Sequence, residues 1–301
     1  MAGEFDFIEW IRAQQPTHAP GVADFVQLPP GDDLAVLKWT GGADDLLLVG
    51  VDQMLDGVHF DASHHSPRAI GRKAMNRNLS DCAAMGCLPA AAVATVALPK
   101  NASMAYAKEL YLGLRDAADP FECPVVGGDT GSWGGKLVVT VTILGRSDGV
   151  KPVTRKGAQV GDSIYVTGPL GGSIRGRHMT FHTRVAMGRQ LAENGVHAMI
   201  DLSDGLSRDL GHICRESGVG AVIDTLTVPV HEDAIEMRRD GHSPLEHALH
   251  DGEDYELLFT APAEFHWFKR IGVITAETRI VLDHGGGKRE PLEPKGWEHS
   301  L

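Results

Sequence analysis

Apolar residues occur along the chain in short runs that alternate with longer segments of mixed apolar and polar character. Runs of roughly four to six apolar residues are typical of buried strands. Such runs predict strands at residues 34–39, 46–52, 90–98, 137–144, 163–167, 219–223 and 255–260, with shorter ones around Val125 and Ile200. The longer segments predict helices at residues 5–13, 66–85, 104–118, 184–194, 206–217 and 244–250. In the second of these, Ser66 and Pro67 form a helix start and Gly86 a helix end. This alternation predicts an α/β (α+β) fold.

The segment 147–161 separates the predicted elements into two groups. It contains Lys151-Pro152, Gly157 and Gly161, residues that interrupt regular structure. A chain of 301 residues is also longer than most single domains. We therefore expect two domains, residues 1–148 and residues 149–301, each large enough to bury its own core.

Aspartates follow several of the apolar runs. Asp52, Asp129 and Asp201 each come directly after or at the end of such a run, Asp204 follows shortly afterwards, and Asp32-Asp33 precedes another run. A single aspartate after a strand is usually a turn or helix-cap residue. Carboxylates that meet at one sheet edge, however, repel one another unless a cation lies between them. The repeated pattern therefore favours a divalent-metal site, and carboxylate oxygens suit Mg²⁺ better than Zn²⁺.

Asp81 is a further candidate ligand. It lies near the end of the predicted helix 66–85, where the helix dipole disfavours a carboxylate by about 0.3–1 kcal/mol. A solvated surface aspartate tolerates this penalty. The surrounding residues, 78–86, are mostly small and apolar, so that the segment is expected to be packed. A buried aspartate needs a positive partner, and a metal ion is the sharper interpretation.

Composition narrows the class of protein. With 40 acidic and 28 basic residues the net charge is −12, which disfavours nucleic acid as a partner. A metal ion can still bridge an acidic protein and a phosphorylated ligand. The first residues lack the pattern of a signal peptide, and no apolar run approaches the roughly 20 residues that span a bilayer. The 4 cysteines form no CxxC pair. We expect a cytoplasmic enzyme with no nucleic-acid or membrane partner.

Nine short motifs occur in order along the chain. They are Gly31-Asp32-Asp33, Asp52 with Gly57-Val58-His59-Phe60, Asn78-Leu79-Ser80-Asp81 with Ala84-Met85-Gly86, Gly127-Gly128-Asp129-Thr130, Arg155-Lys156-Gly157-Ala158, Gly161-Asp162, Tyr165-Val166-Thr167-Gly168, Ile200-Asp201-Leu202-Ser203-Asp204-Gly205-Leu206 and Gly252-Glu253-Asp254-Tyr255-Glu256-Leu257. Together they resemble the thiamine-monophosphate kinase family, part of the superfamily of aminoimidazole ribonucleotide synthetase. The resemblance covers nearly the whole chain from Gly31 onward.

The resemblance implies a homodimer of two-domain subunits that binds ATP and Mg²⁺ in a cleft. The N-terminal mixed-sheet domain would bind ATP and metal and form the dimer, and the C-terminal domain would be α/β. The implied reaction is phosphoryl transfer from ATP to thiamine monophosphate, which gives thiamine diphosphate and ADP. By matching position, the implied magnesium ligands are Asp33, Asp52, Asp81, Asp129, Asp201 and Asp204. The implied nucleotide-binding residues are Gly128, Asp129, Arg155 and Ser203, of which Asp129 and Arg155 would be catalytic, and the substrate-binding residues are His59 and Glu253.

The chemistry of these residue types agrees with that reaction. Phosphoryl transfer needs mainly alignment and neutralisation of charge on phosphate oxygens, and a phosphate monoester acceptor, with a second pKa of about 6, needs no dedicated general base. Arg155 can grip two phosphate oxygens, although a surface ion pair is an equally simple interpretation. His59 is suited to hydrogen-bond the substrate phosphate, but a lone histidine is more often structural. Glu253 could face the cationic rings of thiamine, or it could lie in a solvated loop.

Two departures from the family pattern keep two alternatives open. The family usually has Ser-Thr before the aspartate of the second motif, where this chain has Gly50-Val51. The stretch between Gly172 and Ala198 is also shorter than in many relatives. A related enzyme could therefore phosphorylate another heterocyclic acceptor. A nucleotide- or metal-binding regulatory protein that has lost catalysis is the second alternative.

Overall fold

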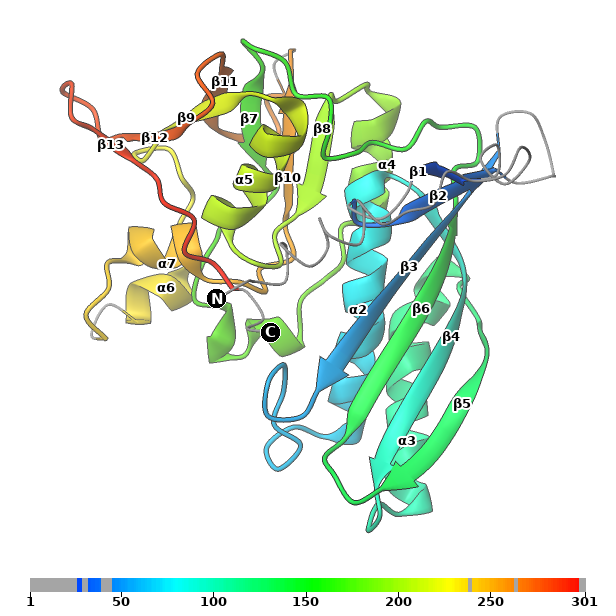
Figure 1. Cartoon of the computed structure of the whole chain (residues 1–301). Coiled ribbons are helices and arrows are strands. Elements are labelled where there is room, and N and C mark those ends of the chain that lie inside the picture. Colours follow the sequence, from blue (N-terminus) through cyan, green and yellow to red (C-terminus); the bar gives the residue numbers. More distant parts are fainter. Residues whose placement is uncertain (1–25, 29–31, 39–44, 238–239, 263–264, 298–301) are drawn as a thin grey trace.

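The computed structural model describes residues 26–28, 32–38, 45–237, 240–262 and 265–297, which form two β-sheets with helices packed on them (Figure 1). The first sheet and its helices comprise β1 (Val26–Leu28), β2 (Ala35–Lys38), β3 (Leu46–Leu55), α2 (Pro67–Met85), β4 (Leu88–Pro99), α3 (Met104–Ala118), β5 (Val125–Trp133) and β6 (Val138–Arg146). The second group comprises β7 (Ser163–Val166), α4 (Val185–Glu193), β8 (Ala198–Asp201), α5 (Leu206–Ser217), β9 (Gly220–Asp224), α6 (Glu232–Met237), α7 (Pro244–His250), β10 (Leu257–Ala261), β11 (Lys269–Thr275), β12 (Ile280–Asp283) and β13 (Arg289–Pro291). Short 3-10 helices cover Asp119–Phe121, Ser173–Arg175 and Arg177–Met179.

The first sheet has one covered and one open face. Its strand order is β1-β2-β3-β6-β4-β5, and all its neighbours are antiparallel except β4 and β5. Helices α2 and α3 cover one face, where Val139, Val141 and Ile143 are fully buried (Figure 1). On the opposite face, Val51 is 61% exposed and Val93 is 37% exposed. Among the described residues this second face is left uncovered, and its apolar side chains are accessible to another molecule.

The second sheet has the order β13-β12-β9-β11-β7-β10-β8, with β9 and β12 as its parallel pair. Met199, Leu257 and Phe259 of this sheet belong to the same hydrophobic core as Leu79 and Met75 of α2. Helix α2 therefore packs against both sheets, which brings its polar residues to the junction between them. A separate core lies on the side of α5 and α7.

Several predicted elements are confirmed with small shifts at their ends. Helix α2 has Ser66 as its N-cap, whose side chain accepts from the backbone N–H of Ala69, and it ends at Gly86 with φ of 66°. The prediction of a helix at residues 5–13 lies outside the described residues. Among those residues, none of the helices has the length and apolar character of a membrane span.

Other predictions were incomplete or wrong. Strand β1, helix α6 and strands β11 to β13 lie where no regular elements were predicted. Strands β1 and β13 are short edge strands, whereas β11 and β12 lie inside the second sheet and combine short apolar runs with polar residues. Asp52 and Asp129 lie inside β3 and β5 and do not end them. Strand β3 is only partly buried and β5 is exposed along nearly its whole length, so that polar residues continue these strands where a doubly buried strand would have to stop.

Candidate active site

Three aspartates from distant segments meet at the junction between the sheets. Asp33 lies two residues before the start of β2, Asp81 lies in the last turns of α2, and Asp201 ends β8. Carboxylate oxygens of these three residues all lie within 4.8 Å of one another. The structure thus brings together three of the six aspartates predicted to bind metal.

The electrostatics of this cluster (Asp33, Asp81 and Asp201) call for a cation. Burial, and then the charge of Asp33, raises the pKa of Asp201 to about 8, and burial and neighbouring carboxylates raise the pKa of Asp81 well above its ordinary value. Ser80 Oγ donates to Asp201 Oδ2 at 2.5 Å. Hard carboxylate oxygens at this spacing fit Mg²⁺, whose charge would relieve the mutual repulsion.

Arg155 supplies part of the compensating charge. It lies in the segment that links the two sheets, and its Nε and Nη2 donate to the two carboxylate oxygens of Asp33 at 3.1 and 2.9 Å. Its backbone N–H donates to Asp32 Oδ2 at 3.1 Å. Burial and the charge of Asp33 raise the pKa of Asp32 to about 7. Arg155 therefore contacts the cluster directly through an ion pair with Asp33.

Helix α2 presents three charged residues to the junction at intervals of four. Lys73, Arg77 and Asp81 occupy positions i, i+4 and i+8, which lie on one helix face. Arg77 Nε lies 3.3 Å from Asp52 Oδ2 on β3. Asp52 thus pairs with arginine and is not within the three-aspartate cluster among the described contacts.

Lys73 joins the two residues predicted to bind substrate. Its fully buried Nζ donates to the backbone O of His59 at 2.6 Å and lies 2.7 Å from Glu253 Oε1. Burial lowers the pKa of Lys73 to about 8 although Glu253 opposes this shift. His59 Nδ1 accepts from the backbone N–H of Leu55 at 3.1 Å, which fixes the ring. His59 and Glu253, more than 190 residues apart in sequence, are thus neighbours of one ammonium group.

The loop that carries Glu253 is tightly held. Glu253 has φ of 61°, and its backbone N–H donates to the O of Ser203 at 2.7 Å. The two acidic residues that follow are buried, Asp254 in an ion pair with Arg177 at 2.9 Å and Glu256 in one with Arg184. The interpretation of this loop as a solvated acidic segment is therefore wrong. Charge pairing fixes the loop and places Ser203 and Glu253 together.

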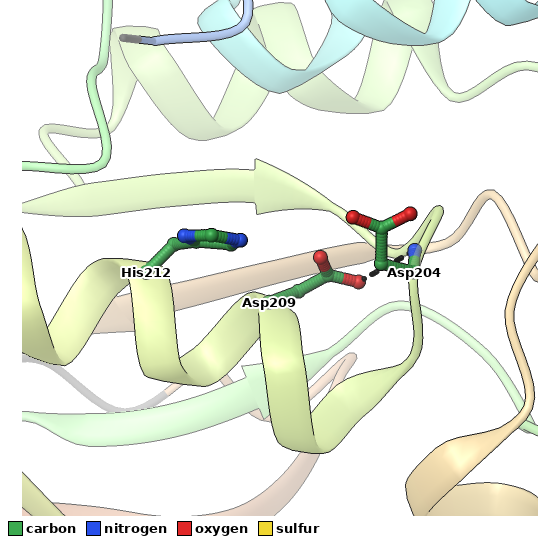
Figure 2. A group of neighbouring side chains, drawn as sticks. All are labelled: Asp204, Asp209 and His212. Carbon is green, nitrogen blue, oxygen red and sulfur yellow. Dashed lines mark hydrogen bonds between the residues drawn. The ribbon is translucent and has the colours of Figure 1, made fainter. Parts of the chain in front are cut away.

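A second group contains Asp204, Asp209 and His212, whose candidate ligand atoms lie within 4.8 Å of one another (Figure 2). Asp209, in the first turn of α5, accepts from the backbone N–H groups of Asp204 and Gly205 at 3.2 and 3.0 Å. Burial and the charge of Arg155 lower the pKa of His212 to about 3. Asp204 is therefore grouped with residues that the sequence reasoning missed, and apart from the other predicted ligands.

The C-terminal segment crosses the loop of Asp204. The backbone N–H of Trp297 donates to the O of Asp204 at 3.0 Å, and Arg208 Nη2 donates to the O of Gly296 at 3.2 Å. A Cβ on Gly296 would lie 2.0 Å from the O of Asp204, so that only glycine permits this approach. Lys295 donates its backbone N–H to Ser207 Oγ at 3.4 Å.

Asp129 lies away from both groups. Its strand, β5, is the edge strand beyond β6 and β4 as counted from β3. Asp129 pairs with Thr95 on β4, and Thr95 and Gln53 both pair with Thr140 on β6, so that Asp129 and Gln53 share the open face of the sheet. Asp52, the neighbour of Gln53 along β3, is therefore on the helix face. Gly128 packs closely on β4, where a Cβ would lie 1.8 Å from the O of Ala94. The prediction that Asp129 joins the other aspartates is not met within one chain.

An apolar groove borders the segment of Gly128 and Asp129, between α3 and strands β4 and β5. It consists of cavities of 570 and 360 Å³ that share lining residues, among them Leu98, Ala107 and Tyr111. The second cavity is also lined by Gly127 to Thr130. Such a concave, apolar site beside polar backbone is typical of small-molecule binding.

The sequence reasoning missed Lys73, Arg77, Asp209 and His212. The interval of four residues between Lys73, Arg77 and Asp81 is a signal that could have revealed the first two, because it places them on one helix face. The partners of these residues come from remote segments, and no sequence pattern indicates them.

Fold and site can now be compared with known proteins. Residues 31–147 match the family model of the AIR synthase related protein N-terminal domain, and residues 159–284 match that of its C-terminal domain. These matches define the class: a two-domain AIR synthase related protein with an acidic junction.

Relatives with assigned names narrow the class. The chain is 38% identical over 316 aligned residues to the thiamine-monophosphate kinase of Rhodopirellula baltica, covering 98% of this chain and 97% of that protein. It is 33% identical to the enzyme of Escherichia coli, covering 91% and 92%. Among solved structures, it is similar to AaThiL complexed with AMPPCP and TMP, with a TM-score of 0.85, 30% identity and coverage of 99% and 97%. The chain belongs to the thiamine-monophosphate kinase family.

Proposed function

We propose that this chain transfers the terminal phosphoryl group of ATP to thiamine monophosphate, forming thiamine diphosphate and ADP with the help of Mg²⁺. The observation that carries the proposal is the arrangement along α2, where Lys73 contacts both residues matched to substrate binding and Asp81 joins the buried aspartate cluster two turns later. A site for an organic acceptor and a site for metal-bound phosphates thus lie side by side. The structural likeness to AaThiL, which was solved with AMPPCP and TMP, supports this assignment.

The proposed roles follow the match of these residues to the family motifs. The proposed metal ligands are Asp33, Asp52, Asp81, Asp129, Asp201 and Asp204. The proposed nucleotide-binding residues are Gly128, Asp129, Arg155 and Ser203, and His59 and Glu253 are proposed to bind the acceptor. When bound, Mg²⁺ neutralises charge on the phosphate oxygens.

The chain's own residues position the reactants. Arg155 pairs with Asp33 through Nε and Nη2, and its remaining N–H donors at Nη1 and Nη2 can hold phosphate oxygens. An oxygen of the acceptor's phosphate attacks the terminal phosphorus of ATP, the bond to ADP breaks, and ADP leaves with the electron pair of that bond. The acceptor oxygen is already ionised at neutral pH, so that no residue has to remove a proton.

The apolar groove beside Gly128 is suited to the nucleobase of ATP. Tyr111, 46% exposed, offers an aromatic surface, and aliphatic side chains line the remaining walls. A purine in this groove would direct its phosphates toward the polar backbone of residues 127–130.

A homodimer would bring this nucleotide edge to the aspartate cluster. The open face of the first sheet carries exposed Val51 and Val93, and the residues of edge strand β5 are exposed. A second copy of the chain covers such a surface in a symmetric pair. We propose that Asp129 of one subunit completes the site formed by Asp33, Asp81 and Asp201 of its partner.

Two further assignments accompany this function. We propose the domain boundary at residue 148, in the segment that carries Arg155 between the two sheets. A cytoplasmic location agrees with the use of ATP and with the four cysteines, which are buried and unpaired as thiols.

Product formation tests the proposal. Purified protein with Mg-ATP and thiamine monophosphate should form thiamine diphosphate and ADP in equal amounts, and omission of either substrate or of Mg²⁺ should abolish both. ADP formed only with a different phosphorylated heterocycle would show that this compound, and not thiamine monophosphate, is the acceptor. Tight binding of Mg-ATP without turnover on any acceptor would indicate the regulatory alternative, which the departure at Gly50-Val51 motivates.

A further inference from the structure

Arg77 lies between the groups proposed to bind the acceptor and those proposed to bind metal. Lys73, four residues before it, contacts His59 and Glu253, and Asp81, four residues after it, belongs to the aspartate cluster. With a rise of about 1.5 Å per residue, Arg77 is about 6 Å along the helix from each of these two residues. The phosphate of an acceptor held at one end and reacting at the other must pass this position.

The guanidinium of Arg77 is buried but incompletely paired. Its Nε lies 3.3 Å from Asp52 Oδ2, yet neither Nε nor Nη1 has a hydrogen-bond partner among the described residues, and both atoms are inaccessible to solvent. Burial opposes the charge, but Asp52 and then Tyr255 outweigh it and raise the pKa of Arg77. A buried, charged donor without an acceptor is unfavourable, and in native proteins such a group calls for a water, ion or ligand that completes it.

The two residues before Asp52, Gly50 and Val51, carry no polar side chain that could contact a phosphate beside Arg77. Leu34 fills the space beside Gly50, where a Cβ would lie 2.2 Å from Leu34 Cδ2. Val51 is on the open face of the sheet and 61% exposed. Neither position offers a hydroxyl oxygen next to Asp52, and the nearby charged side chain on α2 is that of Arg77.

We propose that Arg77 binds the phosphate of the acceptor and holds it between Glu253 and the aspartate cluster. This inference rests on the proposed function and adds a residue that the family motifs do not include. A guanidinium donates strongly to phosphate oxygens, and Nε and Nη1, which point in different directions, are the donors that lack a hydrogen-bond partner among the described residues. Thiamine without its phosphate would gain nothing from Arg77.

Calorimetry with thiamine monophosphate and with thiamine separates this role from a structural one. In Arg77→Met, affinity for thiamine monophosphate should fall about ten- to a hundredfold relative to affinity for thiamine, as expected for the loss of hydrogen bonds to a charged group. Arg77→Lys keeps the positive charge but lacks the Nε and Nη1 donors, and its affinity for thiamine monophosphate should lie between those of wild type and Arg77→Met. Arg72→Met is the matched control, because Arg72 lies on the same helix, is half exposed and pairs with Asp116 at 3.0 Å.

Steady-state kinetics gives a second readout. Arg77→Met should raise the KM for thiamine monophosphate and leave the KM for ATP near its wild-type value. Equal losses of affinity for thiamine and thiamine monophosphate, or the same behaviour in Arg77→Met and Arg72→Met, would overturn the assignment of Arg77 alone. If Arg77→Met does not fold, the same comparisons with Arg77→Lys decide the question. A wild-type chain that binds no thiamine monophosphate would overturn the proposed function and the role of Arg77 with it.

Discussion

A heterodimer of two inactive variants would reveal whether Asp129 acts on its own subunit or on the partner. Asp129→Asn and Asp201→Asn each remove one charge while keeping the shape of the side chain. Each homodimer should lose activity by about a hundredfold or more, as typically follows loss of a group that stabilises reacting phosphates. The informative species is the mixed dimer, which carries one variant on each chain.

The expected activity follows from the sheet. Asp129 is three strands from β3, which at about 4.8 Å per strand is about 14 Å, and its side chain is on the other face of the sheet. Oxygens that bind one metal lie much closer together, as the 4.8 Å limit of the aspartate cluster illustrates. We therefore expect Asp129 to act away from its own chain's cluster. In the mixed dimer, one site receives both substitutions and the other receives neither, so that about half of wild-type activity should remain.

The assay uses two affinity tags and tandem purification of the co-expressed chains, followed by measurement of thiamine diphosphate. A mixed dimer of Asp33→Asn and Asp201→Asn is the control, because both residues lie in one cluster and every site then carries one defect. This control should be inactive. A mixed Asp129 and Asp201 dimer that is equally inactive, or a wild-type chain that is monomeric, would refute the reasoning.

Three further predictions concern stability and metal binding. Lys73→Met should destabilise the protein by about 2–4 kcal/mol in urea unfolding, because the carboxylate of Glu253 then loses its positive partner. The double variant with Glu253→Gln should lose less stability than the sum of the two single variants. Strict additivity would show that the pair is not coupled. Because the pKa of Asp201 is raised to about 8 in the folded chain, metal-free protein should lose stability as pH rises from about 4 to 8. The increase in Tm on adding Mg²⁺ should therefore be larger at about pH 8 than at about pH 6. An increase that does not change with pH would contradict the metal assignment. Gly296→Ala should displace the C-terminal segment and weaken activation by Mg²⁺. Gly211→Ala is the control, because a Cβ at Gly211 meets nothing within 4 Å, and it should leave activation unchanged. Identical Mg²⁺ titrations of the two variants would show that the C-terminal segment does not contribute to the site.

Much of the fold follows from local sequence. The cap residues of α2 fix its ends, whereas its buried residues lie around most of its circumference because the helix packs against both sheets. The family and the two-domain class of the chain were also recognisable from its motifs, and the comparisons confirm both. The short strands β11 to β13 were not predicted, because pairing with neighbours stabilises them more than their own composition does.

The site was predictable in its residue types and less so in its geometry. A run that stops on aspartate places that residue near a strand, but it does not say which face of the sheet the side chain occupies. This is why Asp129 and Asp52 appeared equivalent in the sequence and are on opposite faces in the structure. The partners of Lys73 and Arg77 depend on contacts between remote segments, and these exist only after the two sheets pack on α2.

The spacing of the charged residues Lys73, Arg77 and Asp81 on α2 would also set the length of the acceptor that can react. A helix packed between two sheets cannot stretch, and Lys73 and Asp81 are fixed about 12 Å apart along its axis. An acceptor anchored at the first residue must end its phosphate at a set depth to react at the second. Thiamine diphosphate, one phosphate longer, would overrun that depth, and the reaction would therefore stop after a single transfer. The stiffness of one helix would determine how many phosphates the product carries.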